Sequence, residues 1–153
     1  GFIKLGRLVE CADMTTRIID VGAGDIMERA GRFGAIDPLL WGALLQALSA
    51  AAAYRREVGP IVEKDAALNF IFLSSTFPRS IKYFVRETRK ELMRLNNHDL
   101  AIRAVERLRR RLARLDAEHF TSGELHDYID DFQMQLTSLD AAIQATWFSW
   151  ENT

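Results

Sequence analysis

Apolar residues recur at steps of three and four through most of this 153-residue chain, which places them on one side of an α-helix. The runs from Ala101 to Leu115 and from Leu125 to Trp150 keep this spacing over many turns. The second run predicts a single helix of about 27 residues, about 40 Å long. No stretch alternates apolar and polar residues for long enough to build a β-sheet. The pattern therefore predicts an all-α fold, an antiparallel bundle of about six helices.

Capping and breaking residues divide the chain into these helices. The first is predicted to end at Gly22 and Gly24, with a glycine-rich connector following it. Asn97 is expected to cap the fifth helix and Thr121 to cap the sixth. The predicted helices cover residues 5–21, 37–58, 63–73, 79–95, 97–115 and 121–150, approximately.

The first predicted helix carries a line of charged residues opposite its apolar face: Arg7, Glu10, Asp13 and Arg17. They lie three, four or seven residues apart, so neighbours can contact one another along the helix. Two interpretations remain open. The charges form a solvated face with weak ion pairs, or they form a partly buried network between two helices, where losing one member leaves an unpaired charge.

The same segment and three later ones resemble the alpha-E domain, an all-helical bacterial family named for a Glu-Arg pair in a helix. The resemblance is carried by LGRLVECADMTTRIIDV at 5–21, WGALL at 41–45, YRR at 54–56 and FPRSI at 77–81. It covers most of residues 2 to about 115 and is looser beyond. Here Glu10 is followed by Cys11, where the family usually has arginine.

This resemblance implies that residues 1–153, a single all-helical domain, are the second half of a larger alpha-E domain about twice as long. Members of the family occur beside, and sometimes fused to, ATP-grasp ligase-like and transglutaminase-like proteins. The resemblance therefore implies an interaction or scaffold module in a peptide-modifying system, with one of those proteins as its partner.

Residues 74–80 interrupt the helical pattern with hydroxyl side chains and an arginine at a helix N-terminus, where free N–H groups favour an anion. Arg79 and Ser80 are the predicted ligands of a phosphate or carboxylate. The alternative is that the hydroxyls only cap helix ends and that Arg79 pairs with an acid. An enzyme interpretation would join Glu10, Asp13 and Arg17 to Arg79 in an anion-binding or acid–base site.

Trp147, Phe148 and Trp150 follow one another too closely for all three to face one core. Either the two tryptophans are buried together, or the cluster is an interface that a partner covers. The other half of the domain or a second copy, in a homodimer, is the expected cover.

Charge is unevenly distributed along the chain. Residues 77–114 contain 12 Lys/Arg and 4 Asp/Glu, whereas residues 115–153 contain 8 Asp/Glu and no Lys/Arg. The acidic last helix is therefore expected to lie alongside the Arg-rich helices. Nucleic acid is not an expected partner, because no aromatic residues interleave the arginine stripe on the fifth helix. That stripe consists of Arg103, Arg107, Arg110 and Arg114.

The sequence predicts no metal, cofactor or catalytic residue. None of His98, His119 and His126 follows a glutamate by three residues, so the motif of a di-iron bundle is missing. Cys11 is the single cysteine, which excludes an internal disulfide and suits a reducing cytoplasm. No apolar run approaches the roughly 18 residues that indicate a membrane span, so no membrane contact is expected.

Overall fold

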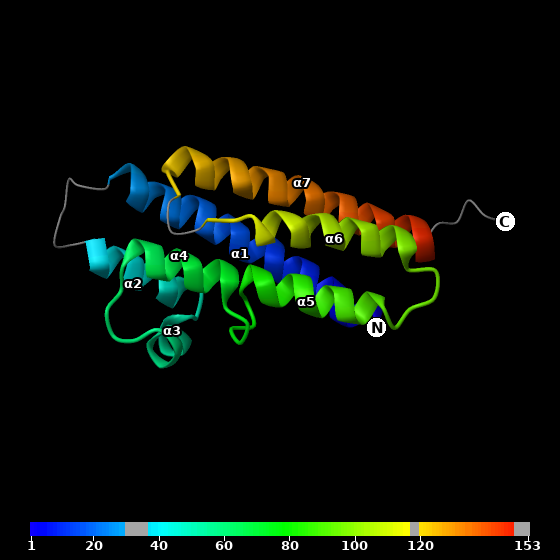
Figure 1. The fold of residues 1–153 in the computed structure, drawn as a ribbon, viewed down its shortest axis with the longest axis horizontal. Coiled ribbons are helices and arrows are strands. Elements are labelled where there is room, and N and C mark those ends of the chain that lie inside the picture. Colours follow the sequence, from blue (N-terminus) through cyan, green and yellow to red (C-terminus); the bar gives the residue numbers. More distant parts are fainter. Residues whose placement is uncertain (30–36, 117–119, 149–153) are drawn as a thin grey trace.

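A computed structural model of the chain describes residues 1–29, 37–116 and 120–148. These residues confirm the predicted all-α bundle, with seven helices in place of about six (Figure 1). The helices are α1 (Phe2–Glu28), α2 (Asp37–Ala47), α3 (Ala51–Glu57), α4 (Lys64–Leu73), α5 (Ile81–Leu92), α6 (Asp99–Ala113) and α7 (Ser122–Trp147). None of these helices combines the length and the apolar composition needed to cross a bilayer.

Helices α1 and α7 lie side by side and antiparallel along the whole length of the bundle (Figure 1). At one end, α5 and α6 complete a four-helix bundle, in which α1 packs on α5, α5 on α6 and α6 on α7. At the other end, α2 packs on α1 and α4 packs on α2, and Phe72 of α4 reaches Tyr128 of α7 with ring centroids 5.5 Å apart. The bundle thus has two ends, each with its own short helices, and α1 and α7 extend through both.

The first helix is longer than predicted. It continues through Gly22 and Gly24 to Glu28, so the prediction that these glycines end it was wrong. Ala23 and Ile26 are buried on the core side, and this burial keeps the last turns helical. A Cβ on Gly22 would lie only 2.7 Å from Cδ1 of Leu44, so this glycine lets α2 approach α1 closely. Residues 30–36 of the predicted connector lie outside the described residues.

The predicted second helix is in fact two helices, α2 and α3, separated by a sharp turn at Ser49. This serine has a φ of 56°, in the left-handed region. Its N–H donates to the carbonyl of Gln46 (2.9 Å), and the N–H of Ala50 donates to that of Leu45 (2.7 Å). This pair of bonds is the Schellman motif that ends many helices. Serine stands where glycine is usual, so the break could not be predicted from the residue type at this position.

The later helix starts follow local capping chemistry. The Thr121 hydroxyl accepts a hydrogen bond from the Glu124 N–H (3.2 Å), as the predicted cap of α7 requires. The prediction that Asn97 caps the fifth helix was wrong. Asn97 has a φ of 59°, and α6 begins two residues later, with His98 at the cap position.

Two glycines of α1 allow a matched test of this packing. Gly24→Ala should stabilise the fold by about 0.5–1 kcal/mol, because alanine favours helix and a Cβ at Gly24 meets no atom within 4 Å. Gly22→Ala should gain less or lose stability, because Leu44 must move. Chemical denaturation of both variants at low protein concentration measures the difference, and equal gains would contradict the close approach of α2.

Candidate functional site

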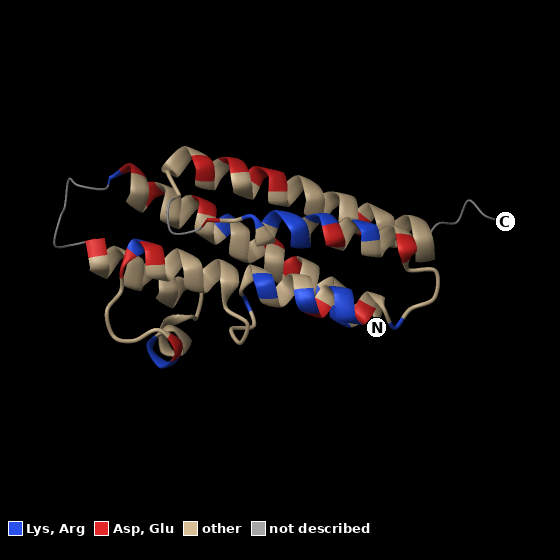
Figure 2. Ribbon diagram, viewed as in Figure 1, with Lys and Arg blue, Asp and Glu red and all other residues tan. Residues whose placement is uncertain are grey.

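Positive and negative side chains are segregated onto different helices (Figure 2). Lys and Arg gather on α5 and α6, and Asp and Glu follow α7. Within the described residues a single ion pair joins α6 to α7, between Arg111 Nε and Asp131 Oδ2 at 2.8 Å. Most of the basic side chains of α5 and α6 are therefore not neutralised by the acidic helix.

A groove of about 960 Å³ lies between α5 and α6, and we call it the basic groove. Its floor is apolar, and its rim carries five cationic side chains and one acidic side chain. The apolar residues are Leu73, Val85, Met93, Leu112, Ala113 and Leu115, the cations are Lys82, Arg86, Arg89, Lys90 and Arg109, and the acid is Glu106.

Glu106 organises two of the cations in the basic groove. Its carboxylate accepts hydrogen bonds from Arg89 Nε (2.9 Å) and Arg109 Nε (2.8 Å). The hydrogen bond from Arg109, followed by that from Arg89, holds the pKa of Glu106 below its ordinary value of 4.5. Lys82 and Lys90 are exposed and form no ion pair within the described part of the chain, so their charges remain available to a ligand.

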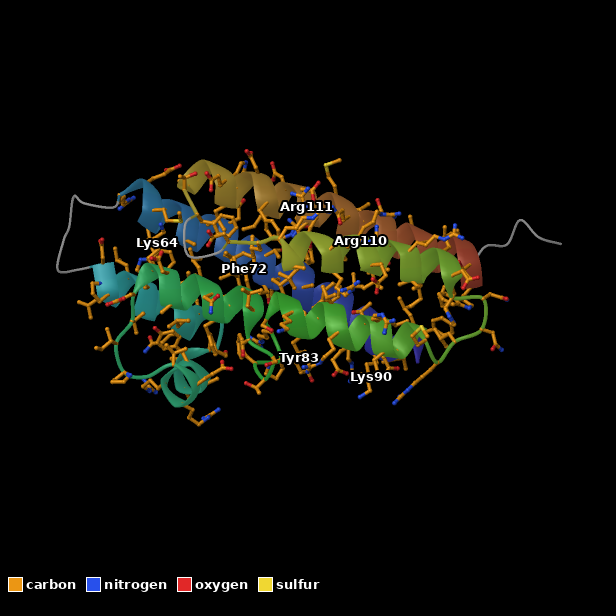
Figure 3. All side chains as sticks on the ribbon, in the orientation of Figure 1. Lys64, Phe72, Tyr83, Lys90, Arg110 and Arg111 are labelled. Atoms are coloured by element: carbon orange, nitrogen blue, oxygen red, sulfur yellow. The ribbon has the colours of Figure 1, made fainter. Side chains whose placement is uncertain are left out.

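The arginine stripe predicted from the sequence extends this basic surface across α6. Arg103, Arg107, Arg110 and Arg114 are all exposed, and none forms an ion pair with another described residue. Figure 3 labels Lys90 on α5 and Arg110 on α6 as reference points for this surface. The sequence showed the stripe but not the apolar floor beside it, which exists only because α5 packs against α6.

The predicted anion ligands Arg79 and Ser80 have partners within the chain. The Ser80 hydroxyl is fully buried, donates to the carbonyl of Ser74 (2.5 Å) and accepts from the Tyr83 N–H (3.0 Å) as the cap of α5. Arg79 Nη1 donates to the carbonyl of Leu48 (3.3 Å), at the end of α2, where a positive charge is favourable. Both side chains thus join helix ends, and anion binding at exposed Arg79 stays a prediction.

A carboxylate of the chain itself contacts the hydroxyls of the same turn. Ser74 Oγ donates to Glu57 Oε2 (2.8 Å), and Thr76 Oγ1 donates to Glu57 Oε1 (3.4 Å). Glu57 ends α3 and so ties that short helix to the turn before α5. An external anion at these hydroxyls would have to compete with this internal one.

The charged line of α1 lies on the solvent side of the helix. Arg7, Glu10 and Arg17 are exposed, and of these three only Arg17 forms an ion pair with another described residue, Asp13 at 3.1 Å. This ion pair is the solvated, within-helix kind, one of the two interpretations left open by spacing. Arg79 lies in the turn between α4 and α5, and its guanidinium donates to the carbonyl of Leu48 at the end of α2. The described part of the chain therefore does not bring Arg79 together with Glu10, Asp13 and Arg17 in one site.

Of the predicted aromatic interface, Trp147 and Phe148 are described and Trp150 lies outside the described residues. Trp147 is partly buried and donates its indole N–H to the carbonyl of Asn96 (3.0 Å). Phe2 packs edge-on against both rings, at 5.5 and 5.0 Å. Phe148 is left about half exposed. The cluster ties the start of α1 to the end of α7, and its use as an interface stays a prediction.

A buried carboxylate on α5 was missed from the sequence. Glu91 is only 3% exposed and receives Lys4 Nζ of α1 at 3.2 Å and Arg94 Nη1 at 3.3 Å. The hydrogen bond from Lys4 is the main cause that lowers its pKa from 4.5. A signal was present, because Glu91 lies three residues after buried Thr88 and seven after buried Phe84, on the core face of α5.

A histidine near the start of α7 bridges two carboxylates. His126 Nδ1 lies 3.0 Å from Asp20 Oδ1 of α1, and its Nε2 lies 3.3 Å from Asp130 Oδ2. The hydrogen bond to Asp20, with the charges of Asp130 and Asp127, raises the pKa of His126 above 6.5. Among the described residues no group of three or more His, Cys, Asp or Glu has the arrangement of a metal site. His119 lies outside those residues.

Comparison with models of protein families assigns this chain to a family. The model of the Alpha-E family, a predicted alpha-helical domain with a conserved ER motif, matches residues 1–148. The chain belongs to the Alpha-E family. Comparisons with curated proteins and with solved structures found no match.

In this Alpha-E chain, glutamate is directly followed by arginine at Glu28-Arg29 and at Glu106-Arg107, whereas Glu10 precedes Cys11. Glu106 is the acid of the basic groove. The glutamate of one Glu-Arg pair therefore lines the candidate site, while Arg107 lies on the neighbouring arginine stripe.

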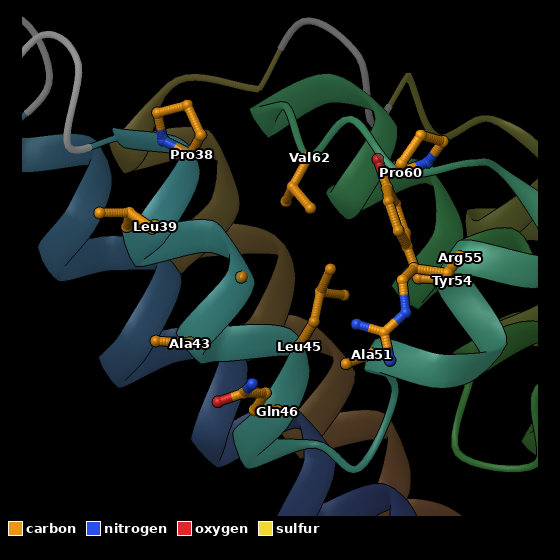
Figure 4. Close-up of a pocket in the computed structure, with 11 residues that line it drawn as sticks. Pro38, Leu39, Ala43, Leu45, Gln46, Ala51, Tyr54, Arg55, Pro60 and Val62 are labelled. Carbon is orange, nitrogen blue, oxygen red and sulfur yellow. The ribbon is translucent and has the colours of Figure 1, made fainter.

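A second pocket of this Alpha-E bundle, about 430 Å³, lies among α2, α3 and the segment that follows α3 (Figure 4). Tyr54 forms one wall and donates its hydroxyl hydrogen to the carbonyl of Ile61 (2.8 Å). Arg55 is the single charged residue of the lining. The pocket thus offers neither an acid–base pair nor a set of metal ligands, and the basic groove remains the stronger candidate site.

The histidine bridge predicts a pH-dependent contribution to stability. The raised pKa means that protonated His126 stabilises the fold below about pH 6.5, and that this contribution is lost as the pH rises through the raised pKa. The stability gap between the wild type and His126→Ala should therefore be larger at pH 5.5 than at pH 8.5. Denaturant unfolding measures the gap, and Asp20→Asn should shrink it. A gap independent of pH would contradict the bridge.

The buried carboxylate of Glu91 should make a contribution to stability with the opposite pH dependence. Its lowered pKa means that the ionised carboxylate stabilises the fold above about pH 4.5, and that this is lost as the pH falls through the lowered pKa. Glu91→Gln should therefore be less stable than the wild type at pH 7, with the gap closing toward pH 3. Thermal unfolding followed by circular dichroism tests this, with Asp140→Asn at an exposed position of α7 as the matched control.

Proposed function

We propose that this Alpha-E chain is an interaction module whose basic groove binds an acidic, amphipathic segment of a partner protein. The observation that carries the proposal is the apolar floor between α5 and α6 bordered by five cations and one acid. Apolar side chains of a bound helix or extended segment would cover the floor. Its carboxylates would meet the unpaired ammonium groups of Lys82 and Lys90.

The composition of the groove favours a protein segment over a nucleic acid. Single-stranded nucleic acids bind on aromatic side chains that stack with bases, and none of the described residues that line the groove is aromatic. The floor includes exposed Met93, an adaptable side chain of the kind that suits peptide-binding surfaces. A nucleic acid would leave this apolar floor uncovered.

The family resemblance adds a class of partner to this proposal. An ATP-grasp ligase-like or transglutaminase-like protein would supply the acidic segment, and the module would hold it in a peptide-modifying system. The family's associations support this partner class, whereas the residues of the basic groove support the acidic segment.

A designed peptide tests the groove directly. The probe is a fluorescent helical peptide with leucines on one face and glutamates on the other. It should bind more tightly than a scrambled peptide of the same composition, because only the former can cover the floor and meet the rim together. Lys82→Glu with Lys90→Glu should weaken binding about tenfold or more. Arg55→Glu with Arg56→Glu, the same charge change on α3, should not.

Three outcomes would overturn the proposal. Equal binding of the scrambled peptide would show charge attraction alone, and equal binding by the groove variant would place the site elsewhere. Tighter binding of an oligonucleotide with a steep salt dependence would favour nucleic acid. Co-purification of the chain with its ATP-grasp or transglutaminase-like neighbour, lost in the groove variant and kept in the α3 variant, tests the partner class.

A further inference from the structure

The face of α1 that points away from the bundle is partly apolar. Ile3, Met14 and Val21 are 77%, 63% and 76% exposed, respectively. Their spacing of eleven and seven residues places all three on one line along the helix. Isolated apolar side chains on a surface are ordinary. Three on one helix face, however, form an apolar strip of the kind that a partner protein covers.

Two glycines lie beside this strip without a packing role in the chain. A Cβ on Gly6 or on Gly24 would meet no atom within 4 Å, whereas one on Gly22 would collide with Leu44. Each glycine destabilises the helix relative to alanine. They leave shallow notches, one near each end of the strip.

The charges of the same face are arranged about its middle. Glu10 precedes Met14 and Arg17 follows it, and both are exposed. The two lie seven residues apart, about 10 Å along the axis, too far for a direct ion pair within one helix. Glu10 forms no ion pair with any described residue.

We infer that this face is a homodimer interface, in which α1 packs antiparallel against α1 of a partner subunit. One register satisfies every feature of the face. Glu10 lies opposite Arg17 of the partner subunit, whose guanidinium also holds Asp13 of its own helix (3.1 Å within one copy), and by symmetry the same contact forms twice. Ile3 lies over the notch at Gly24 of the partner subunit, and Val21 over the notch at Gly6 of the partner subunit. Met14 lies close to the two-fold axis.

A second copy is the occupant because the face complements itself. An acid and a base lie at equal distances from the centre, and so do two apolar side chains and two notches. An unrelated acidic or basic partner would need no such symmetry. The interface uses α1 and not α5 or α6, so it is independent of the proposed groove function. A dimer would present two basic grooves and could bind a bivalent partner more tightly.

Charge reversal and charge exchange test the pairing. Sedimentation velocity over a range of concentrations should show reversible dimers for the wild type. Glu10→Arg places like charges opposite each other and should weaken dimerisation about tenfold or more. Glu10→Arg combined with Arg17→Glu exchanges the charges and should restore it. Asp140→Arg on α7, the same charge change at another exposed site, should leave the dimer intact, and circular dichroism verifies folding.

Cross-linking tests the register. In a Cys11→Ser background, Met14→Cys should form a disulfide-linked dimer under mild oxidation, because Met14 faces its own copy. Met134→Cys on α7, whose methionine is similarly exposed at 70%, should not. A monomer at every concentration, a dimer insensitive to Glu10→Arg, or equal cross-linking at both positions would overturn the inference. The groove variants test a different surface, so either proposal can fail alone.

Discussion

The antiparallel packing of α1 against α7 is the contact on which the other helices depend. These are the two longest of the described helices, with 27 and 26 residues, and they extend through both ends of the bundle. Buried Thr16 of α1 lies at their interface, where its hydroxyl accepts a hydrogen bond from the side chain of Gln133 and donates to the carbonyl of Ala12 at 2.8 Å. The remaining helices have 7 to 15 residues, too short to be stable alone in water. Of these, α2 and α5 pack on α1 and α6 packs on α7, whereas α3 and α4 pack on α2 and so depend on the long pair indirectly.

The same architecture explains why charge collects on one side. At the four-helix end of the bundle, α6 packs on α7 through its core face. The arginine stripe of α6 points outward, so its side chains lie beyond the reach of the α7 carboxylates. Glu106 holds Arg89 and Arg109 in place and Asp131 holds Arg111, whereas Lys82, Lys90 and the arginine stripe of α6 face solvent. Segregation of this kind costs some stability through repulsion between like charges, and it creates a field that attracts acidic ligands.

The sequence predicted what depends on local chemistry and missed what depends on packing. Helical spacing and the Thr121 cap identified the fold class and the start of α7 correctly. The continuation of α1 through Gly22 depends on contact with Leu44, and the break at Ser49 depends on a backbone conformation that serine seldom adopts. Neither contact nor conformation can be read from spacing.

The candidate site divides in the same way. The arginine stripe of α6 was visible in the sequence, but the basic groove required the pairing of α5 with α6, shown by the Arg89–Glu106 contact between residues 17 apart. Ser80 was identified as important for a ligand, and the structure makes it a buried cap. Glu91 was overlooked although its position on the apolar face of α5 marked it as buried.

The order of the helices along the chain also has a consequence for how the fold forms. Helices α5, α6 and α7 follow one another and pack as successive hairpins, whose contacts are local and cost little loop entropy to close. The contact between α1 and α7 joins opposite ends of the chain and carries the largest closure cost. Folding is therefore expected to begin in the α5–α7 hairpins, and the docking of α1 to be the late step. Until that step is complete, the inner apolar face of α1 is open to other chains as well, in addition to the outer strip that stays exposed in the folded chain.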